Sequence, residues 1–402
     1  MPDQAEIRRI APDELDAWSD GEWKSWGYRQ GDPWRRVLER CDVLAAVEGG
    51  ALVGGVAGVP FALTVPGGML SVAGIASAWV RPERRGQGLF RRLMDAQLAG
   101  FAEERVAAAV LIASEPGIYE RFGFGVASFA SRLRIAAGLR SGSSRAEAEA
   151  ITLVDREAGV NAAAEIYERV RHGIPGMLDR DPAWWAYSFP EEDPDEEHPT
   201  LFALHGRGRE CDGYAAYSVH AGWTDEGRPD NTAVVHELVA EAPVAYSALW
   251  SYCLGLPLCG AIEAENRPVD EPLLHMLDDS ARVRLSIVDA LHLRIFDVAE
   301  ALAARRYSTE GELVLAVHDD AGGWAQGRWL LEGRTDGADC KRTEAAPDLA
   351  IESAVLACVY LGGSSFEALR WAGRVEELSP GAVRRADQLF SWTPAPWLPW
   401  DY

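Results

Sequence analysis

A glycine-containing turn in front of an amphipathic helix constrains this chain more than any other stretch. The turn reads Arg84-Arg85-Gly86-Gln87-Gly88. After it, apolar residues recur at spacings of three and four, which predicts a helix that begins at once: Leu89, Phe90, Leu93, Met94, Leu98 and Phe101. A helix start offers unpaired N–H groups and a positive dipole end, and two glycines let the backbone approach an anion. The turn therefore predicts a pyrophosphate site, or else only a tight strand-to-helix connection with solvated arginines.

The segments on both sides of the turn predict strands. Residues 69–80 are expected to form one strand, and residues 107–113 are a continuous apolar run, as in a strand that is buried on both faces. A second helix is expected to start near Tyr119. Further strands are predicted at 42–47, 51–59 and 61–65, and a strand at 129–135 would close this first unit. The tryptophan-rich segment 18–34 either lines a pocket or packs as a helical pair on the core.

Composition limits the classes of protein to consider. At about 100–200 residues per domain, 402 residues suggest two to four domains. The formal charge of −23 argues against a broad basic face for nucleic acid. It is compatible with a cationic substrate, although solubility alone also explains it. No apolar run is long enough to span a membrane and the first residues carry charges throughout, so we expect a cytoplasmic protein.

Cysteine, histidine and short motifs exclude several other chemistries. The six cysteines form no C-x-x-C pair, which favours buried reduced thiols. His236-Glu237 lacks the second histidine of an H-E-x-x-H site, because Ala240 stands in its place. We therefore expect no metal site. No G-x-S-x-G elbow, Walker loop or Rossmann G-x-G-x-x-G is present, so nothing specific supports a hydrolase, an NTPase or a dehydrogenase.

Linker-like segments divide the chain into three units with expected limits of 1–139, 140–289 and 290–402. Residues 141–150 are small and polar, as in a linker, and the acidic, proline-rich residues 190–199 are expected in a surface loop. The second unit is predicted to contain helices at 161–170 and 244–254, strands at 201–204, 214–220 and 232–240, and a helix start at 273–277. The third is predicted to contain strands at 311–318 and 328–332 and helices at 298–304, 350–360 and 364–372. The final residues, TPAPWLPWDY, hold three prolines and are expected to dock as an extended strap.

Taken together, these motifs resemble the GCN5-related N-acetyltransferases (GNATs). The order of strand, R-G-x-G turn, helix, strand and tyrosine is similar to that family, although Phe90 stands where glycine or alanine is usual. The run SEPGIYERFGFG and the whole length of the chain look like the Eis branch, and residues 347–378 resemble its C-terminal domain. The resemblance implies an α/β (α+β) chain with a catalytic GNAT domain, a GNAT-like domain without the catalytic motif, and a sterol-carrier-protein-like (SCP2-like) domain. It also implies a homo-hexamer.

The resemblance assigns roles to particular residues. It implies that acetyl-CoA is bound by the turn, by the backbone of the preceding strand and by the end of the next strand, through Arg85, Gly86, Gly88, Leu89, Ala78, Val80, Ser114 and Glu115. The Val80 N–H would donate to the thioester oxygen. Tyr119 would protonate the departing thiolate, because a tyrosine with a pKa of about 10 is protonated at neutral pH. The alternative for Tyr119 is an ordinary core tyrosine.

The base implied by the resemblance is unusual, because in that family a C-terminal carboxylate enters the active site. Here it would belong to Tyr402, where the family usually has phenylalanine. A free carboxylate with a pKa of about 3.3–3.7 is a weak base, so it would need burial or a water relay, or it would only hold a cationic substrate. The alternative is a purely structural strap.

The sequence leaves two main hypotheses for the function of the protein. The first is an acetyl-CoA-dependent N-acetyltransferase that acts on primary amines of an aminoglycoside, a polyamine or a lysine side chain. The second is a protein that binds an apolar ligand or lipid in its C-terminal unit and has a vestigial acetyltransferase site. A purely structural assembly role is a third hypothesis, which the intact turn disfavours.

Overall fold

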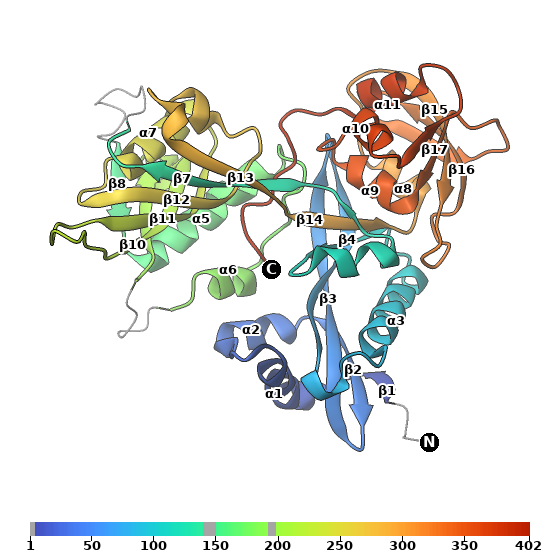
Figure 1. The fold of residues 1–402 in the computed structure, drawn as a ribbon, viewed down its shortest axis with the longest axis horizontal. Helices are drawn as coiled ribbons and strands as arrows, with labels where there is room; N and C mark the ends of the chain where they lie inside the picture. The colour runs from blue at the N-terminus through green and yellow to red at the C-terminus, as the bar shows by residue number, and fades with distance from the viewer. Residues whose placement is uncertain (1–4, 140–149, 192–197) are drawn as a thin grey trace.

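The computed structural model describes residues 5–139, 150–191 and 198–402, which form three lobes in chain order (Figure 1). The predicted linker, except Ala150, and most of the predicted acidic loop lie outside the described residues. The described part holds two seven-stranded sheets and one five-stranded sheet together with helices. This confirms the α/β class. Among the described helices, none has the length and apolar character to cross a membrane.

The first sheet contains the strands next to the glycine turn. Its order is β1 (Glu6–Arg9), β2 (Asp42–Glu48), β3 (Ala51–Val65), β4 (Gly68–Val80), β5 (Ala108–Ile112), β14 (Leu291–Ile295) and β6 (Gly125–Val126). The predicted strands 51–59 and 61–65 are one long strand, β3. Only β4 and β5 run parallel. A parallel pair needs a crossover connection, and α3 (Leu89–Glu103) supplies it.

Helices cover both faces of this sheet (Figure 1). On one face, α3 buries Leu93, Met94 and Leu98, three members of the periodic set that predicted it. On the other face lie α1 (Leu15–Trp26) and α2 (Gly31–Leu38). Here α1 approaches very closely, because the Trp79 ring of β4 occupies the space that a Cβ on Gly21 would need. The first helices therefore press directly on the strand that precedes the turn.

The second sheet has the same arrangement. Its order is β8 (Ile151–Val154), β9 (Leu201–His205), β10 (Gly213–His220), β11 (Asn231–Ala240), β12 (Cys259–Arg267), β7 (Phe129–Ala136) and β13 (Val283–Asp289). Strands β11 and β12 are the parallel pair and α7 (Pro243–Leu254) joins them. The other helices of this lobe are α5 (Arg156–Arg171) and α6 (Pro182–Ser188). The predicted helix start at 273–277 is wrong: the segment forms a short 3-10 turn at Pro272–His275.

The two sheets exchange one strand each. Strand β7 pairs with β12 and β13 of the second sheet, so the prediction that residues 129–135 close the first unit is wrong. In return, β14 inserts between β5 and β6 of the first sheet. The strands that pair here are far apart in sequence, so the local hydrophobic pattern of a strand does not predict which sheet it joins. The first two lobes are thus joined through their sheets as well as through the chain.

The third lobe is a five-stranded sheet with four helices. Its order is β17 (Ala338–Arg342), β16 (Gly327–Gly333), β15 (Gly311–His318), β18 (Leu349–Glu352) and β19 (Val375–Glu377), and its helices are α8 (Val298–Ala303), α9 (Ser353–Tyr360), α10 (Phe366–Trp371) and α11 (Ala382–Phe390). The prediction of one helix over 350–360 is partly wrong, because its start is β18. The Ala354 carbonyl oxygen occupies the space that a Cβ on Gly125 of β6 would need, so α9 packs closely on the first sheet.

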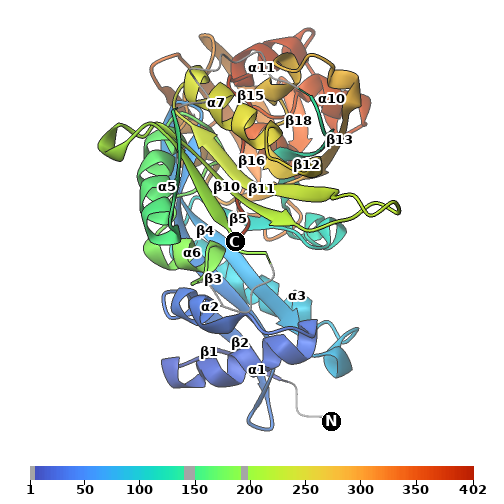
Figure 2. The same cartoon turned by 90° about the vertical axis from the view of Figure 1, so that its left-hand side faces the viewer.

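The final segment, residues 391–402, is the strap. It leaves the third lobe and ends between the first two sheets, beside α6 and β3, in both views (Figures 1 and 2). Trp397 donates its backbone N–H to the Pro175 carbonyl at 2.8 Å, and the Trp400 indole donates to the Tyr167 hydroxyl at 2.9 Å. Both tryptophans are buried. The prediction of a docked, extended strap is confirmed.

Candidate active site

One cavity of about 840 Å³ gathers most of the predicted site residues. It lies at the ends of β4 and β5 and is bounded by the glycine turn, the α1–α2 region and the end of the strap. Its lining includes eight predicted site residues: Ala78, Val80, Arg85, Gly86, Ser114, Glu115, Tyr119 and Tyr402. The other two, Gly88 and Leu89, begin α3 beside this lining, and the Leu89 side chain is buried.

The glycine turn has the conformation that an anion site requires. Gly86 and Gly88 have φ angles of 73° and 75°, a region that favours glycine. Gly88 is the N-cap of α3, and among the described residues no side chain caps this helix start. Its first N–H groups are therefore available to an anion.

The two arginines of the turn have different partners. Arg84 forms an ion pair with Glu48, 2.6 Å away. Arg85 donates to the Val80 carbonyl at 3.2 Å and to the Ser25 carbonyl at 2.9 Å, so its guanidinium closes the wall between β4 and α1. Of the pair, only Arg85 lines the cavity.

The strand β4 leaves its edge open at the cavity. It pairs with β5 only over residues 72–75, so residues 76–80 have no partner on that strand. Its pairing with β3 shifts register at the same place, and Ser77 there has a φ of 50°, which is uncommon for a residue other than glycine. The parallel strands thus separate into a slot in which an extended ligand can add along β4, as an extra strand would.

Tyr119 lies in a turn that links two short 3-10 helices, so the predicted second helix is not an α-helix. Its ring packs edge-on against Phe90 and Phe124, with centroids 6.0 and 6.2 Å away. Phe90, the residue that departs from the family pattern, therefore supports the tyrosine. Burial, with a smaller contribution from Glu115, raises the pKa of Tyr119 to about 12. The hydroxyl remains a proton donor at neutral pH.

Tyr402 lines the same cavity. Its ring lies 4.9 Å from Phe61 of β3 and 6.0 Å from Trp184 of α6, centroid to centroid. The hydroxyl is buried without a hydrogen-bond partner among the described residues, and burial raises the pKa of this phenol well above its ordinary value. The ring thus anchors the strap end by packing alone.

The strap is also fixed from the side of the second lobe. The Arg180 guanidinium lies over the Trp400 ring, 4.7 Å from its centroid, and forms a buried ion pair with Glu237 at 2.9 Å. These contacts hold the end of the chain at the junction of the first two lobes. The tryptophan-rich segment 18–34 contributes to the cavity in part, since Trp26 and Trp34 line it, and Trp79 of β4 lines it as well. Ser77 and Tyr187 also line it and have no signal in the sequence that marks them.

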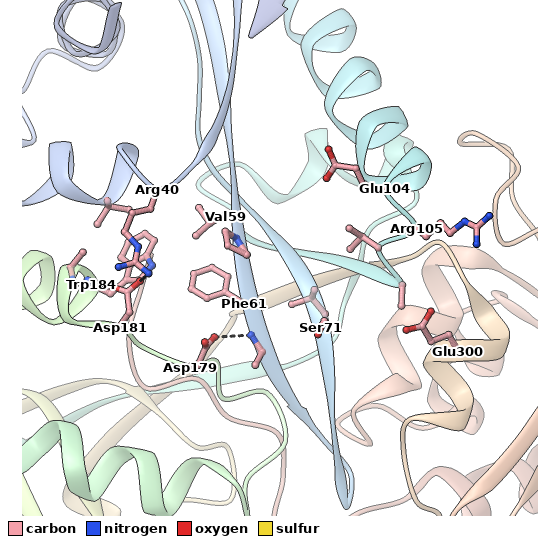
Figure 3. A pocket seen from close by; sticks show the side chains of 17 residues that line it. Arg40, Val59, Phe61, Ser71, Glu104, Arg105, Asp179, Asp181, Trp184 and Glu300 are labelled. Carbon is pink, nitrogen blue, oxygen red and sulfur yellow. Dashed lines mark hydrogen bonds and ion pairs between the residues drawn. The ribbon is translucent and has the colours of Figure 1, made fainter. Parts of the chain in front are cut away.

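A second cavity, of about 570 Å³, is lined by Phe61, Trp184 and polar side chains of the first two lobes (Figure 3). Phe61 and Trp184, which hold the Tyr402 ring, form part of its wall. Asp179 there accepts the Ala62 N–H at 2.7 Å, and Asp181 pairs with Arg40 at 3.1 Å (Figure 3). It contains none of the predicted site residues. The cavity with the open slot is therefore the candidate active site.

Comparison with known proteins agrees with this geometry. Profiles of an acetyltransferase (GNAT) domain match residues 6–127 and 176–295, and a sterol carrier protein domain matches residues 298–399. The chain is 34% identical to an uncharacterized N-acetyltransferase of Streptomyces avermitilis over 98% of both chains. It is 33% identical to the N-acetyltransferase Eis of Mycobacterium tuberculosis, over 82% of this chain and 80% of that protein.

Solved structures extend the comparison to the whole fold. The crystal structure of Eis1 from Mycobacterium abscessus has a TM-score of 0.85 and 32% identity and covers 99% of this chain and 100% of that chain. A GCN5-related N-acetyltransferase from Anabaena variabilis has the same TM-score at 20% identity, which supports the fold alone. The chain has two GNAT domains and a sterol carrier domain, and it belongs to the Eis family of N-acetyltransferases.

Proposed function

We propose that this acyltransferase moves the acetyl group of acetyl-CoA to a primary amine in the cavity at the β4–β5 slot. The observation that supports this most strongly is the meeting of three features around one cavity. These are an uncapped helix start behind two glycines with positive φ, an open β4 edge, and a buried tyrosine hydroxyl. A pyrophosphate, a pantetheine arm and a thioester would require these three features in this order along a ligand.

In this proposal each part of CoA is bound by its own set of residues. The pyrophosphate binds at Gly86, Gly88 and Leu89, with Arg85 beside it. The pantetheine arm adds along the backbone of Ala78 and Val80. Ser114 and Glu115 border the thiol end, at the tip of β5.

The transfer is one displacement at the thioester. The amine nitrogen attacks the carbonyl carbon, a C–N bond forms, and the C–S bond breaks. The Val80 N–H stabilises the developing oxyanion, and the Tyr119 hydroxyl gives its proton to the departing thiolate. The proton of the amine passes to the Tyr402 carboxylate, whose position is set by the packed Tyr402 ring.

The acceptor in this proposal is a cationic small molecule, an aminoglycoside or a polyamine, or a lysine side chain. The formal charge of −23 favours the approach of cations. We also propose that the active form is a hexamer, as the family resemblance implies. Sedimentation analysis at the assay concentration checks that state.

The test is an acceptor screen with a free-thiol readout. The protein is incubated with acetyl-CoA and with an aminoglycoside, a polyamine or a lysine peptide, and thiol release above the amine-free rate is expected with at least one. A variant with two glycines appended after Tyr402 is expected to bind acetyl-CoA and release no thiol. Full activity of the extended variant contradicts the role of the Tyr402 carboxylate, and no release with any amine contradicts the proposal.

The match of residues 298–399 to a sterol carrier domain supports a second candidate, the binding of an apolar ligand. The same screen separates the two functions. Lipid binding without thiol release from any amine would favour the binding protein.

A further inference from the structure

A buried carboxyl group lies directly behind the wall of the active-site cavity. Glu22 of α1 has an exposed fraction of only 1%. In the described part of the chain, no arginine, lysine or histidine pairs with it. Buried acids in proteins are usually paired, and an unpaired one beside a cleft points to a functional site.

The donors that reach Glu22 come from residues that line the cavity. The Trp34 indole N–H donates to both carboxyl oxygens, at 3.0 and 3.1 Å. The Ser77 hydroxyl donates to one of the same oxygens. Both Trp34 and Ser77 face the cavity that holds Tyr119 and Tyr402. Glu22 therefore connects α1 to the reaction space through two side chains.

The backbone around this contact is held in an uncommon conformation. Ser77 has a φ of 50° and lies at the register shift of β4. The neighbouring Trp79 ring touches the position of Gly21 and packs edge-on against Trp18, 5.3 Å away. Strained positions of this kind persist only where the surroundings fix them, and they cluster at functional sites.

The contact sets the direction in which Ser77 can hydrogen-bond. A hydroxyl has one proton and two acceptor lone pairs, and the Ser77 proton is given to Glu22. The lone pairs then remain for a donor in the cavity. Burial raises the pKa of Glu22, while the hydrogen bonds from Ser77 and Trp34 act in the opposite direction and favour the ionised form. A carboxylate at this depth exerts a stronger field than one in water.

We infer that Glu22 is a positioning residue for the acetyl transfer, because it holds the Ser77 hydroxyl as an acceptor for one N–H of the incoming amine. This inference rests on the proposed function. The amine is thus held at two points: Ser77 accepts one N–H, and the Tyr402 carboxylate takes the proton that leaves. The two contacts aim the nitrogen lone pair at the thioester carbon.

The test compares Glu22→Gln with Ser77→Ala and with the double variant. Glutamine has nearly the same size, and its amide can donate to Ser77 and reverse the hydroxyl. A hydrogen bond to a charged group contributes about 1.5–3 kcal/mol, so kcat/KM for the amine should fall about tenfold to a hundredfold. The KM for acetyl-CoA should not change. Because Glu22 acts through Ser77, the double variant should be no slower than either single variant.

The control is Asp20→Asn, which removes an acid from the solvent side of the same helix, where Asp20 pairs with Lys24. It is expected to keep full activity. If Glu22 has only a structural role, Glu22→Gln will lower the melting temperature and leave the ratio of kcat/KM for the amine to kcat/KM for acetyl-CoA unchanged. That result overturns the inference. If Glu22→Gln does not fold, Ser77→Ala alone decides, and an unchanged amine kcat/KM overturns the inference.

The outcomes separate this inference from the proposed function. If the wild-type protein acetylates an amine and both single variants keep its rate, only the role of Glu22 fails. If the wild-type protein acetylates none, the proposed function fails and the inference fails with it.

Discussion

The first two sheets have the same strand arrangement, yet within the described residues only the first has the glycine turn and the open slot of the candidate active site. Each has four strands in sequence order, then a parallel partner joined by a helix, then the exchanged strand and a last edge strand. In each, the register of the central strand shifts close to the place where the parallel pair separates. The scaffold alone therefore does not make the site.

The turns that start the two crossover helices differ. In the first sheet α3 starts after Gly88, which has a left-handed conformation. In the second sheet α7 starts after Ala242, with Pro243 in its first turn and Glu241 just before it. Glu241 is negative and pairs with Arg169 at 2.6 Å. An anion that approached this helix start would meet the Glu241 carboxylate, which the start of α3 does not have.

The slots between the parallel strands differ as well. In the first sheet the slot is open as the cavity. In the second, Arg267 at the end of β12 fills it and donates to the Leu238 carbonyl of β11 at 2.7 Å. Glu271 pairs with this buried guanidinium at 2.9 Å, and the strap residue Trp397 lies 5.0 Å from it. In the second domain this slot is thus filled by the chain's own side chains, one of which contacts the strap.

Removing one oxygen atom from the candidate site in the first domain should abolish most of the activity. Tyr119→Phe is expected to lower kcat by about 10²–10⁴-fold, because a positioned general acid contributes that much. The ring contacts with Phe90 and Phe124 remain, so stability should hold. Thiol release at saturating acetyl-CoA measures the effect. Tyr246→Phe, which removes a hydroxyl that has no partner among the described residues, is the control, and equal rates for both variants would refute the assignment.

Emptying the filled slot of the second domain should cost stability without creating activity. Arg267→Met leaves Glu271 buried without its partner, so the free energy of unfolding should fall by about 3–5 kcal/mol. Denaturant unfolding measures it. Exposed Arg284→Met on β13 should have little effect, and Arg267→Met/Glu271→Leu should recover part of the loss. An Arg267→Met protein with an unchanged free energy of unfolding would show that the Arg267–Glu271 pair in this slot does not stabilise the fold.

Changing the glycine turn tests whether it distinguishes the two domains. Gly88→Val forces a β-branched residue to a φ of 75°, which costs about 1–2 kcal/mol, so the KM for acetyl-CoA should rise about tenfold. Gly227 in the second domain also has a φ of 75° and open space around it. Gly227→Val is expected to lose similar stability and to keep the KM. A raised KM in both variants would mean that general destabilisation is the cause.

Local patterns predicted the parts of this site that depend on short stretches of chain. The periodicity after Leu89 predicted α3, and the apolar tryptophans among prolines predicted the docked strap, because each is a property of neighbouring residues. The exchange of β7 and β14 could not be predicted, since a strand has the same alternation in either sheet. Glu22 was missed for a related reason: an acid in a short amphipathic helix usually faces solvent, and only the close approach at Gly21 buries it.

The smallest expected effect concerns the pH dependence of the first domain. In the proposed mechanism the protonated form of Tyr119 is the active one, so activity falls as pH rises through its pKa. Burial raises that pKa from 10 to about 12, which moves the loss upward and beyond the range in which an exposed tyrosine would titrate. The kcat of the wild-type protein at saturating amine should therefore show no decline caused by Tyr119 between pH 8 and about pH 10.5. A break near pH 10 in kcat that is absent from Tyr119→Phe would show that the Tyr119 hydroxyl is solvated in the working enzyme. Tyr119 would then be buried in the free protein but not during turnover.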